Sequence, residues 1–163
     1  MKKKIEILAP AKNLVQGIAA INSGADAVYI GAPLYGARSN ATNSVEDIAE
    51  LVKYAHLFNA QVFVVINTIL YDNELEPCRQ LIWKLYDIGV DALIIQDMAI
   101  MEMELPPIVL HASTQTNNRD ADKIKFLADA GIKRVVLARE LNLSQIKEIH
   151  NASDVELEFF VTG

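Results

Sequence analysis

Gly24-Ala25-Asp26-Ala27-Val28-Tyr29-Ile30-Gly31 is the stretch that decides the fold, because its pattern recurs further along the chain. Two copies run from Gly89 to Gln96 and from Gly131 to Ala138, and a fourth copy starts at Asn59. Glycine and asparagine tolerate the left-handed backbone that ends a helix, so each copy predicts a helix end, a tight turn and a buried strand. The repeating unit is therefore a helix followed by a strand.

The predicted strands are short continuous apolar runs, without the alternation of a half-exposed antiparallel sheet. This pattern favours a parallel sheet covered by helices. The strands are expected near residues 5–9, 27–31, 61–67, 92–96, 108–111, 134–138 and 155–161. Apolar residues at helical spacing over 48–55 and 75–85 predict two of the covering helices. Ser44, and Asn142 with Gln145 three residues on, are typical helix starts.

Parallel strands joined by right-handed crossovers can close into a barrel or spread into a doubly wound sheet. The first strand leads into Pro10-Ala11-Lys12-Asn13, not into a glycine-rich dinucleotide pattern. We therefore predict an α/β fold, an incomplete TIM-like β/α barrel with a parallel sheet of about seven strands. A complete barrel has eight strands in about 250 residues. The prediction is thus a single β/α-barrel-like domain over residues 1–163, truncated at its C-terminal end, with exposed sheet edges that favour a homodimer.

The amino-acid composition limits the class of protein and its cellular location. With 52% apolar residues, the chain can bury one sizeable core, and its net charge of -6 disfavours a large nucleic-acid footprint on this chain. The apolar runs fall short of the roughly 18 residues that cross a membrane. The one cysteine, Cys78, cannot form an internal disulfide and lies on a core-facing helical stripe. These observations predict a cytoplasmic protein that does not contact a membrane.

Polar residues follow the predicted strands at the rim where β/α barrels carry their chemistry. The candidate catalytic residues are His111, Arg139 and Glu140. The candidate substrate-binding residues are Lys12, Arg38, Asn40, Asn67, Gln96, Asp97, Ser113 and Gln115. No metal site is predicted, because the chain has no HExxH helix, no GxSxG turn and no paired-cysteine spacing.

Each candidate also has a structural interpretation. His111, placed directly after the apolar run 108–110, can shuttle a proton or hold a ligand, or can fix the loop by bonding a neighbouring backbone group. Arg139 and Glu140 can clamp an anion or simply pair with neighbours across the rim. The long loop 32–43 suits a binding loop or a structural lid. Lys12 is a catalytic amine only if burial lowers its pKa, and otherwise it is solvated.

Several segments together resemble the collagenase-like peptidase family, peptidase family U32. They include residues 8–11, Asn67-Thr68-Ile69-Leu70, Leu110-His111-Ala112-Ser113-Thr114-Gln115 and Ala138-Arg139-Glu140-Leu141. Residues 36–38, 43–52 and 91–98 are most similar to the branch that acts in hydroxylation of a cytidine in large-subunit ribosomal RNA. Other branches are similar to proteins for transfer-RNA uridine and ubiquinone hydroxylation.

The resemblance implies a barrel-like N-terminal region and, in the hydroxylation branches, cysteines that bind an iron-sulfur cluster. The family pattern begins Glu-x-Phe-x-x-Gly and continues into a cysteine-containing stretch. Glu158, Phe160 and Gly163 match its opening, whereas Thr162 stands where the family usually has histidine. The cluster is therefore expected in the full-length protein, with no cofactor and no activity expected in this fragment alone.

Three functions follow as hypotheses. The first is RNA modification, with ribosomal RNA as the partner and the rim holding a small anion or a flipped base. The second is a peptidase acting on proteins or peptides, as the family name implies, although no activated nucleophile is visible. The third is a non-catalytic scaffold that binds a partner through an open sheet edge.

Overall fold

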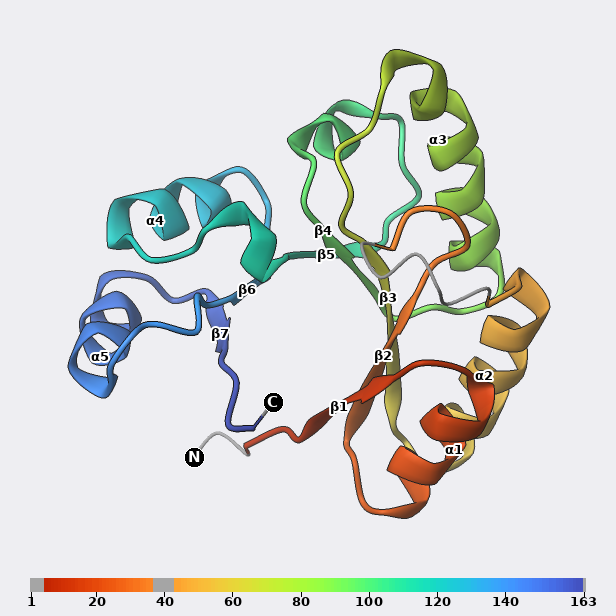
Figure 1. The fold of residues 1–163 in the computed structure, drawn as a ribbon. Coiled ribbons are helices and arrows are strands. Elements are labelled where there is room, and N and C mark those ends of the chain that lie inside the picture. Colours follow the sequence, from red (N-terminus) through yellow and green to blue (C-terminus); the bar gives the residue numbers. More distant parts are fainter. Residues whose placement is uncertain (1–4, 37–42, 163) are drawn as a thin grey trace.

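The computed structural model describes residues 5–36 and 43–162 and shows a curled parallel sheet with helices on its outer side (Figure 1). Neighbouring strands pair in sequence order from β1 to β7, and every pair is parallel. The strands are β1 (Leu8–Ala11), β2 (Ala27–Gly31), β3 (Gln61–Ile66), β4 (Ala92–Ile95), β5 (Val109–Ala112), β6 (Arg134–Val136) and β7 (Glu156–Glu158). The predicted incomplete barrel with a parallel seven-stranded sheet is confirmed.

Helices fill most of the crossovers between the strands. The α-helices are α1 (Leu14–Asn22), α2 (Val45–Leu57), α3 (Asp72–Asp87), α4 (Ala121–Asp129) and α5 (Leu143–Ala152). At the start of α2 the predicted N-cap Ser44 forms a capping box with Asp47, and at the start of α5 Asn142 and Gln145 form the predicted capping box. The crossover from β4 to β5 carries only the short 3-10 helix η1 (Met98–Glu102) among its described residues. No helix in the described part of the chain has the length and apolar character to span a bilayer.

The repeated turns have the backbone that the sequence predicts. Gly24, Gly89 and Gly131 have φ angles of 96°, 87° and 115°, in the left-handed region that favours glycine. Asn59, which opens the fourth copy, has φ 54°. Each turn leads the chain from the end of a helix into the next strand, so the four copies of the repeat form the same kind of helix-to-strand turn.

Some strand boundaries differ from the prediction. β1 begins at Leu8, not at residue 5, because Leu8 pairs with Ala27, the first residue of β2. The backbone N–H of Ile7 instead donates to the Asp26 side chain at 3.0 Å. β7 is confined to Glu156–Glu158, and β6 ends at Val136. These shifts decide which side chains end up inside the curl.

Successive side chains along each strand alternate between the two faces of the sheet. The outward side chains, such as Val28, Val62 and Leu93, pack with the helices in the large core. Phe63 and Ile94 belong to a smaller cluster on the other, inner face. Because the sheet curls, inner-face residues from distant strands converge on the same space.

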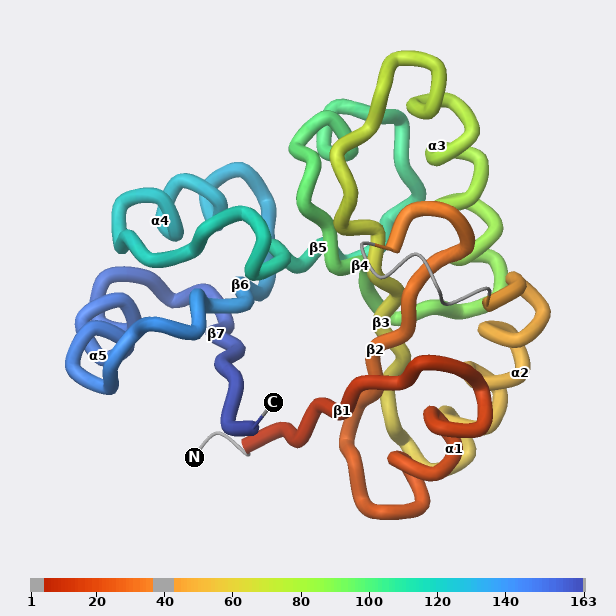
Figure 2. Tube along the Cα trace, in the orientation of Figure 1, coloured from red at the N-terminus to blue at the C-terminus, as the bar shows by residue number. Residues whose placement is uncertain are grey.

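Within the described residues, β1 pairs only with β2, and β7 only with β6. Figures 1 and 2 show these two ends of the sheet turning toward one another, with the N-terminal segment beside the end of the chain. A side-chain contact crosses between them, since Glu6 precedes β1 and binds Arg134 of β6. This contact therefore bridges the two ends of the curled sheet.

Candidate functional site

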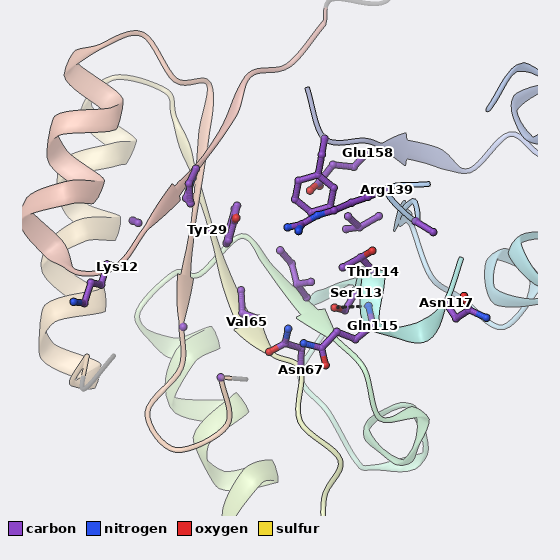
Figure 3. Close-up of a pocket in the computed structure, with 18 of the residues that line it drawn as sticks. Lys12, Tyr29, Val65, Asn67, Ser113, Thr114, Gln115, Asn117, Arg139 and Glu158 are labelled. Atoms are coloured by element: carbon purple, nitrogen blue, oxygen red, sulfur yellow. Dashed lines mark hydrogen bonds between the residues drawn. The ribbon is translucent and has the colours of Figure 1, made fainter. Parts of the chain in front are cut away.

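A cavity of about 1030 Å³ opens at the carboxyl ends of the strands, where β/α barrels place their chemistry (Figure 3). The predicted site residues that line it are Lys12, Asn67, Ser113, Gln115, Arg139 and Glu140. Glu158 and Phe160, from β7 and the segment after it, complete the wall beside Arg139. Polar side chains that follow different strands thus meet at this rim.

Arg139 is the positive group of this cavity. Its guanidinium carbon lies 4.3 Å from the centre of the Phe160 ring, a cation–π contact that holds the planar head group in place. No carboxylate among the described residues forms an ion pair with it. A guanidinium that is oriented but not neutralised can bind a carboxylate or phosphate with two hydrogen bonds.

Glu140 points its charge elsewhere. Its Oε1 lies 3.2 Å from Nη1 of Arg119, and both side chains are more than half exposed. Pairing with a neighbour across the rim was the alternative to anion binding that the sequence analysis gave for Glu140. An exposed ion pair of this kind contributes little to the free energy of folding. Arg139 and Glu140 therefore do not act as one clamp in this structure.

The segment after β5 is anchored by hydrogen bonds. Ser113 begins the 3-10 helix η2 (Thr114–Thr116), and its Oγ accepts from the backbone N–H of Gln115 at 3.2 Å. Asn118, which is fully buried, donates to the carbonyl oxygens of Ser113 and Val136, each at 2.9 Å. The loop that presents Ser113 and Gln115 is thus tied to β6, and Figure 3 shows Gln115 beside Asn67.

Other predicted residues have structural or peripheral positions. Asp97 caps η1 and also accepts from the backbone N–H of Leu70 at 2.9 Å, and neither Asp97 nor Gln96 lines the cavity. Lys12 is exposed at the rim opposite Arg139. Arg38 and Asn40 lie outside the described residues.

Asn43, at the end of the long loop, is buried and has a structural role. Its Nδ2 donates to the carbonyl oxygens of Lys12 and Gly31, at 3.1 and 3.2 Å. These two oxygens follow β1 and end β2, so Asn43 ties together the exits of neighbouring strands. Asn43 therefore anchors the backbone directly before helix α2 to the ends of β1 and β2.

The predicted position of His111 directly after its strand is wrong, because β5 continues through Ala112. His111 points to the inner face, where its ring meets that of Phe63 edge-on at 4.8 Å. It lines a second cavity of about 630 Å³, nearer the amino ends of the strands and shared with Arg134. Burial, and then the positive charge of Arg134, lower the pKa of His111 to about 3. The ring is neutral near pH 7, and its buried Nδ1 has no hydrogen-bond partner among the described residues.

The buried His111 predicts a pH-dependent stability. Because its pKa is about 3 when folded and about 6.5 when unfolded, the unfolded chain binds the extra proton, and stability falls as the pH drops from about 6.5. The free-energy difference between the wild type and His111→Asn should therefore change by roughly 1 kcal/mol between about pH 6 and pH 5. Urea unfolding at both pH values measures this, with the exposed His150→Asn as control. Parallel stability curves for wild type and His111→Asn would contradict the prediction.

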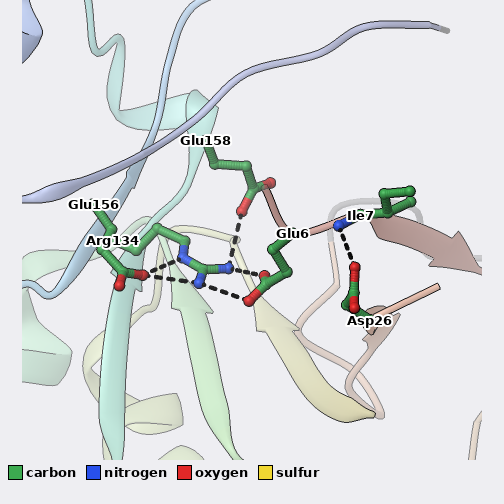
Figure 4. A network of polar contacts seen from close by, with 6 residues as sticks. All are labelled: Glu6, Ile7, Asp26, Arg134, Glu156 and Glu158. Carbon is green, nitrogen blue, oxygen red and sulfur yellow. Dashed lines mark hydrogen bonds and ion pairs between the residues drawn. The ribbon is translucent and has the colours of Figure 1, made fainter. Parts of the chain in front are cut away.

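Arg134 organises the polar interior (Figure 4). Its guanidinium binds Glu6 through two bonds of 2.5 and 3.2 Å, and Glu156 through two of 3.1 and 2.8 Å. Glu158 reaches it only at 4.0 Å. Burial raises the pKa of Glu158 to about 7, which the charge of Arg134 offsets only in part. Neither Arg134 nor Glu158 was among the predicted site residues. A signal was present in the sequence, because Glu156 and Glu158 are two residues apart in a predicted buried strand and so share one face of the sheet.

The described residues do not fit an iron-sulfur cluster. Cys78 is fully buried in α3, and burial raises the pKa of its thiol to about 11, whereas cluster ligands are thiolates. The described residues also contain no group of three or more His, Cys, Asp or Glu side chains able to hold a metal ion.

Fold and cavity define an incomplete β/α-barrel protein with a polar cavity at the carboxyl ends of its strands. The chain belongs to Peptidase family U32, whose sequence profile matches residues 12–163. This confirms the resemblance seen in the sequence.

Curated relatives cover nearly the whole chain. It is 57% identical over 160 residues to the "23S rRNA 5-hydroxycytidine C2501 synthase" of Escherichia coli (strain K12), an alignment covering 98% of this chain and 24% of that protein. It is 37% identical to the "tRNA hydroxylation protein P1" of Bacillus subtilis (strain 168), covering 99% of this chain and 39% of that protein. An uncharacterized protease of Methanocaldococcus jannaschii is 39% identical, over 100% of this chain and 42% of that protein. The chain thus spans less than half the length of these relatives.

Solved structures support the fold alone. A structure described as a U32 peptidase superposes with a TM-score of 0.77 at 13% identity, over 98% of this chain and 69% of that one. A dihydrodipicolinate synthase superposes with a TM-score of 0.61 at 19% identity, over 94% of this chain and 62% of that one.

Proposed function

We propose that this chain forms the barrel of a protein that hydroxylates a cytidine in large-subunit ribosomal RNA. The observation that carries the proposal is the 57% identity, over 98% of this chain, to the Escherichia coli 5-hydroxycytidine synthase. The proposed partner is therefore ribosomal RNA, and the proposed location is the cytoplasm. A net charge of -6 leaves little positive surface for a duplex, so the wider RNA footprint is proposed to lie outside these residues.

The mouth cavity is the proposed site for the reacting nucleoside. Its volume of about 1030 Å³ accommodates a base turned out of its stack. The Phe160 ring and the Arg139 guanidinium offer a stacking wall and a positive charge. The amides of Asn67 and Gln115 lie where they can bond polar edges of the base or a small anion.

The remaining predicted residues take different parts in this proposal. Lys12, Arg38 and Asn40 would contact the RNA strand at the rim, whereas the neutral ring of His111 would shape the layer beneath the cavity. An iron-sulfur cluster is proposed for the full-length protein, held by cysteines other than Cys78. We also propose that residues 1–163 act as one domain and that an edge strand, β1 or β7, can pair with a second copy. A monomeric mass in light scattering would rule the pairing out.

A peptidase is the second candidate, favoured by the relative printed as a protease and by the U32 peptidase structure. Two hydroxyls at the cavity form hydrogen bonds with the backbone. Ser113 Oγ accepts a backbone N–H, and Thr114 Oγ1 donates to the Leu137 carbonyl at 3.2 Å. Peptide hydrolysis needs a nucleophile activated by a base, which these contacts do not provide. Cleavage of denatured collagen by the full-length protein would support this candidate.

Nucleoside mass spectrometry of large-subunit ribosomal RNA tests the first proposal. Deleting the gene should remove 5-hydroxycytidine, and a plasmid copy of the gene should restore it. Unchanged 5-hydroxycytidine after deletion would contradict the proposal. Loss of collagen cleavage in the same deletion strain, with the RNA unchanged, would favour the peptidase, and the absence of both effects would favour a scaffold.

A further inference from the structure

Three carboxylates share one guanidinium inside the curl, and they do not share it equally. Arg134 forms two hydrogen bonds with Glu6 and two with Glu156, which occupy its Nε, Nη1 and Nη2 atoms. Oε2 of Glu158 lies 4.0 Å from Nη1, beyond hydrogen-bond distance. This oxygen is buried and has no hydrogen-bond partner among the described residues. Glu158 is thus the surplus carboxyl of the network.

The charge balance favours a proton on that surplus carboxyl. Three ionised carboxylates and one guanidinium would leave two net negative charges in a partly buried space, and like charges disfavour joint ionisation. His111 supplies no compensating charge, because burial and Arg134 hold its pKa near 3. The charged groups around Glu158 are therefore Arg134 from β6, Glu6 from before β1, Glu156 from β7 and, on the mouth side, Arg139 from the segment after β6. Burial accordingly raises the pKa of Glu158 to about 7.

Glu158 also belongs to the mouth cavity. It lines that cavity with Arg139 and Phe160, and Figure 3 shows its side chain beside Arg139. In Figure 4 its carboxyl group extends from β7 toward Arg134. The Glu158 carboxyl group therefore lies between the mouth cavity and the largely buried guanidinium of Arg134. A group in this position can exchange a proton with a bound molecule while Arg134 stabilises the carboxylate that results.

We propose that Glu158 is the group that exchanges a proton with the molecule bound in the mouth cavity. The inference rests on the proposed function, because it assigns a role within the same site. The neutral carboxyl gives its proton to a basic atom of the ligand and becomes a carboxylate beside Arg134. In the reverse direction the Glu158 carboxylate takes up one proton from the ligand or from solvent. Each step thus transfers one proton between Glu158 and its partner.

The first test does not depend on any substrate. Carbon-13 NMR of the protein with labelled glutamate carboxyls follows each side chain through a pH titration, and the signal missing from Glu158→Gln assigns Glu158. We expect its midpoint near pH 7. The exposed Glu148→Gln, an equivalent change on α5, should leave that signal unchanged. A Glu158 midpoint in the range of ordinary exposed glutamates, about 4.3, would overturn the inference.

The second test measures 5-hydroxycytidine formation in the deletion strain carrying plasmid copies of the gene. Glu158→Gln should slow modification of newly made ribosomal RNA by about 100-fold or more, whereas Glu148→Gln should match the wild type. If the wild type and Glu158→Gln restore modification equally, the proton-exchange role is wrong while the proposed function stands. If the wild type restores none, the proposed function fails, and the titration still decides the state of Glu158. Circular dichroism confirms that both variants fold.

Discussion

Replacing Arg134 with methionine is expected to lower the free energy of unfolding by roughly 1–3 kcal/mol, between the values for exposed ion pairs and for buried pairs that lose one partner. The Arg134 side chain is only 12% exposed, and it holds Glu6 and Glu156 while facing Glu158. Without the guanidinium, the three carboxylates would repel one another, most strongly at Glu6 and Glu158, which are less exposed than Glu156. Urea unfolding followed by circular dichroism at neutral pH measures the change.

The position of Arg134 adds a second consequence. Glu6 lies 128 residues away in the sequence, and its contact with Arg134 links the segment before β1 to β6. Loss of this link should free the two ends of the curled sheet, so amide hydrogen exchange should rise first in β1 and β7. Lys133→Met is the matched control, because it removes a neighbouring but exposed cation. Equal stability losses in Arg134→Met and Lys133→Met would show that the buried network does not hold the fold.

Replacing Arg139 with alanine is expected to slow 5-hydroxycytidine formation by about 100-fold or more, as loss of a preorganised charged donor does in other active sites. The guanidinium is oriented by Phe160 and has no carboxylate partner among the described residues, so its charge is available to a ligand. Its loss should leave the fold intact, because the ring contact is a weak one at a cavity wall. The rate at which newly made ribosomal RNA is modified in the complemented deletion strain gives the measurement.

Two variants sharpen this test. Arg139→Lys keeps the charge but loses the planar fork, so an intermediate rate is expected if bidentate binding matters. Lys147→Ala, which removes an exposed cation from α5, should match the wild type. A wild-type rate in Arg139→Ala, with the protein present at normal level, would exclude Arg139 from the site.

The elements of this fold could be predicted because local chemistry determines them. Gly24, Gly89 and Gly131 adopt the positive φ angles that their positions between helix and strand require. Ser44 and Asn142 form the capping boxes that their neighbours indicate. Such features depend on residues three or four apart, which the sequence shows directly.

The interior could not be predicted in the same way. His111 was placed after its strand, but β5 continues through Ala112. Because side chains in a strand alternate between the two faces, an error of one residue decides whether a side chain is assigned to the mouth or to the inner face. The Arg134 network needs Glu6 from before the first strand and Glu156 from the last, and only the curl of the sheet brings them together. Asp97, a predicted substrate-binding residue, accepts from the backbone N–H of Leu70, 27 residues away in the sequence, and this contact was not predicted. Contacts of this length depend on the fold rather than on local pattern.

A chimera tests the central proposal most directly. These 163 residues would replace the matching segment of the Escherichia coli 5-hydroxycytidine synthase in a strain that lacks the native gene, with the corresponding segment of the Escherichia coli tRNA hydroxylation protein P, to which this chain is 34% identical, as control. Nucleoside mass spectrometry is expected to find 5-hydroxycytidine restored in 23S ribosomal RNA by this chain and not by the control. A chimera that accumulates as a folded protein yet leaves the RNA unmodified would show that these residues do not support cytidine hydroxylation.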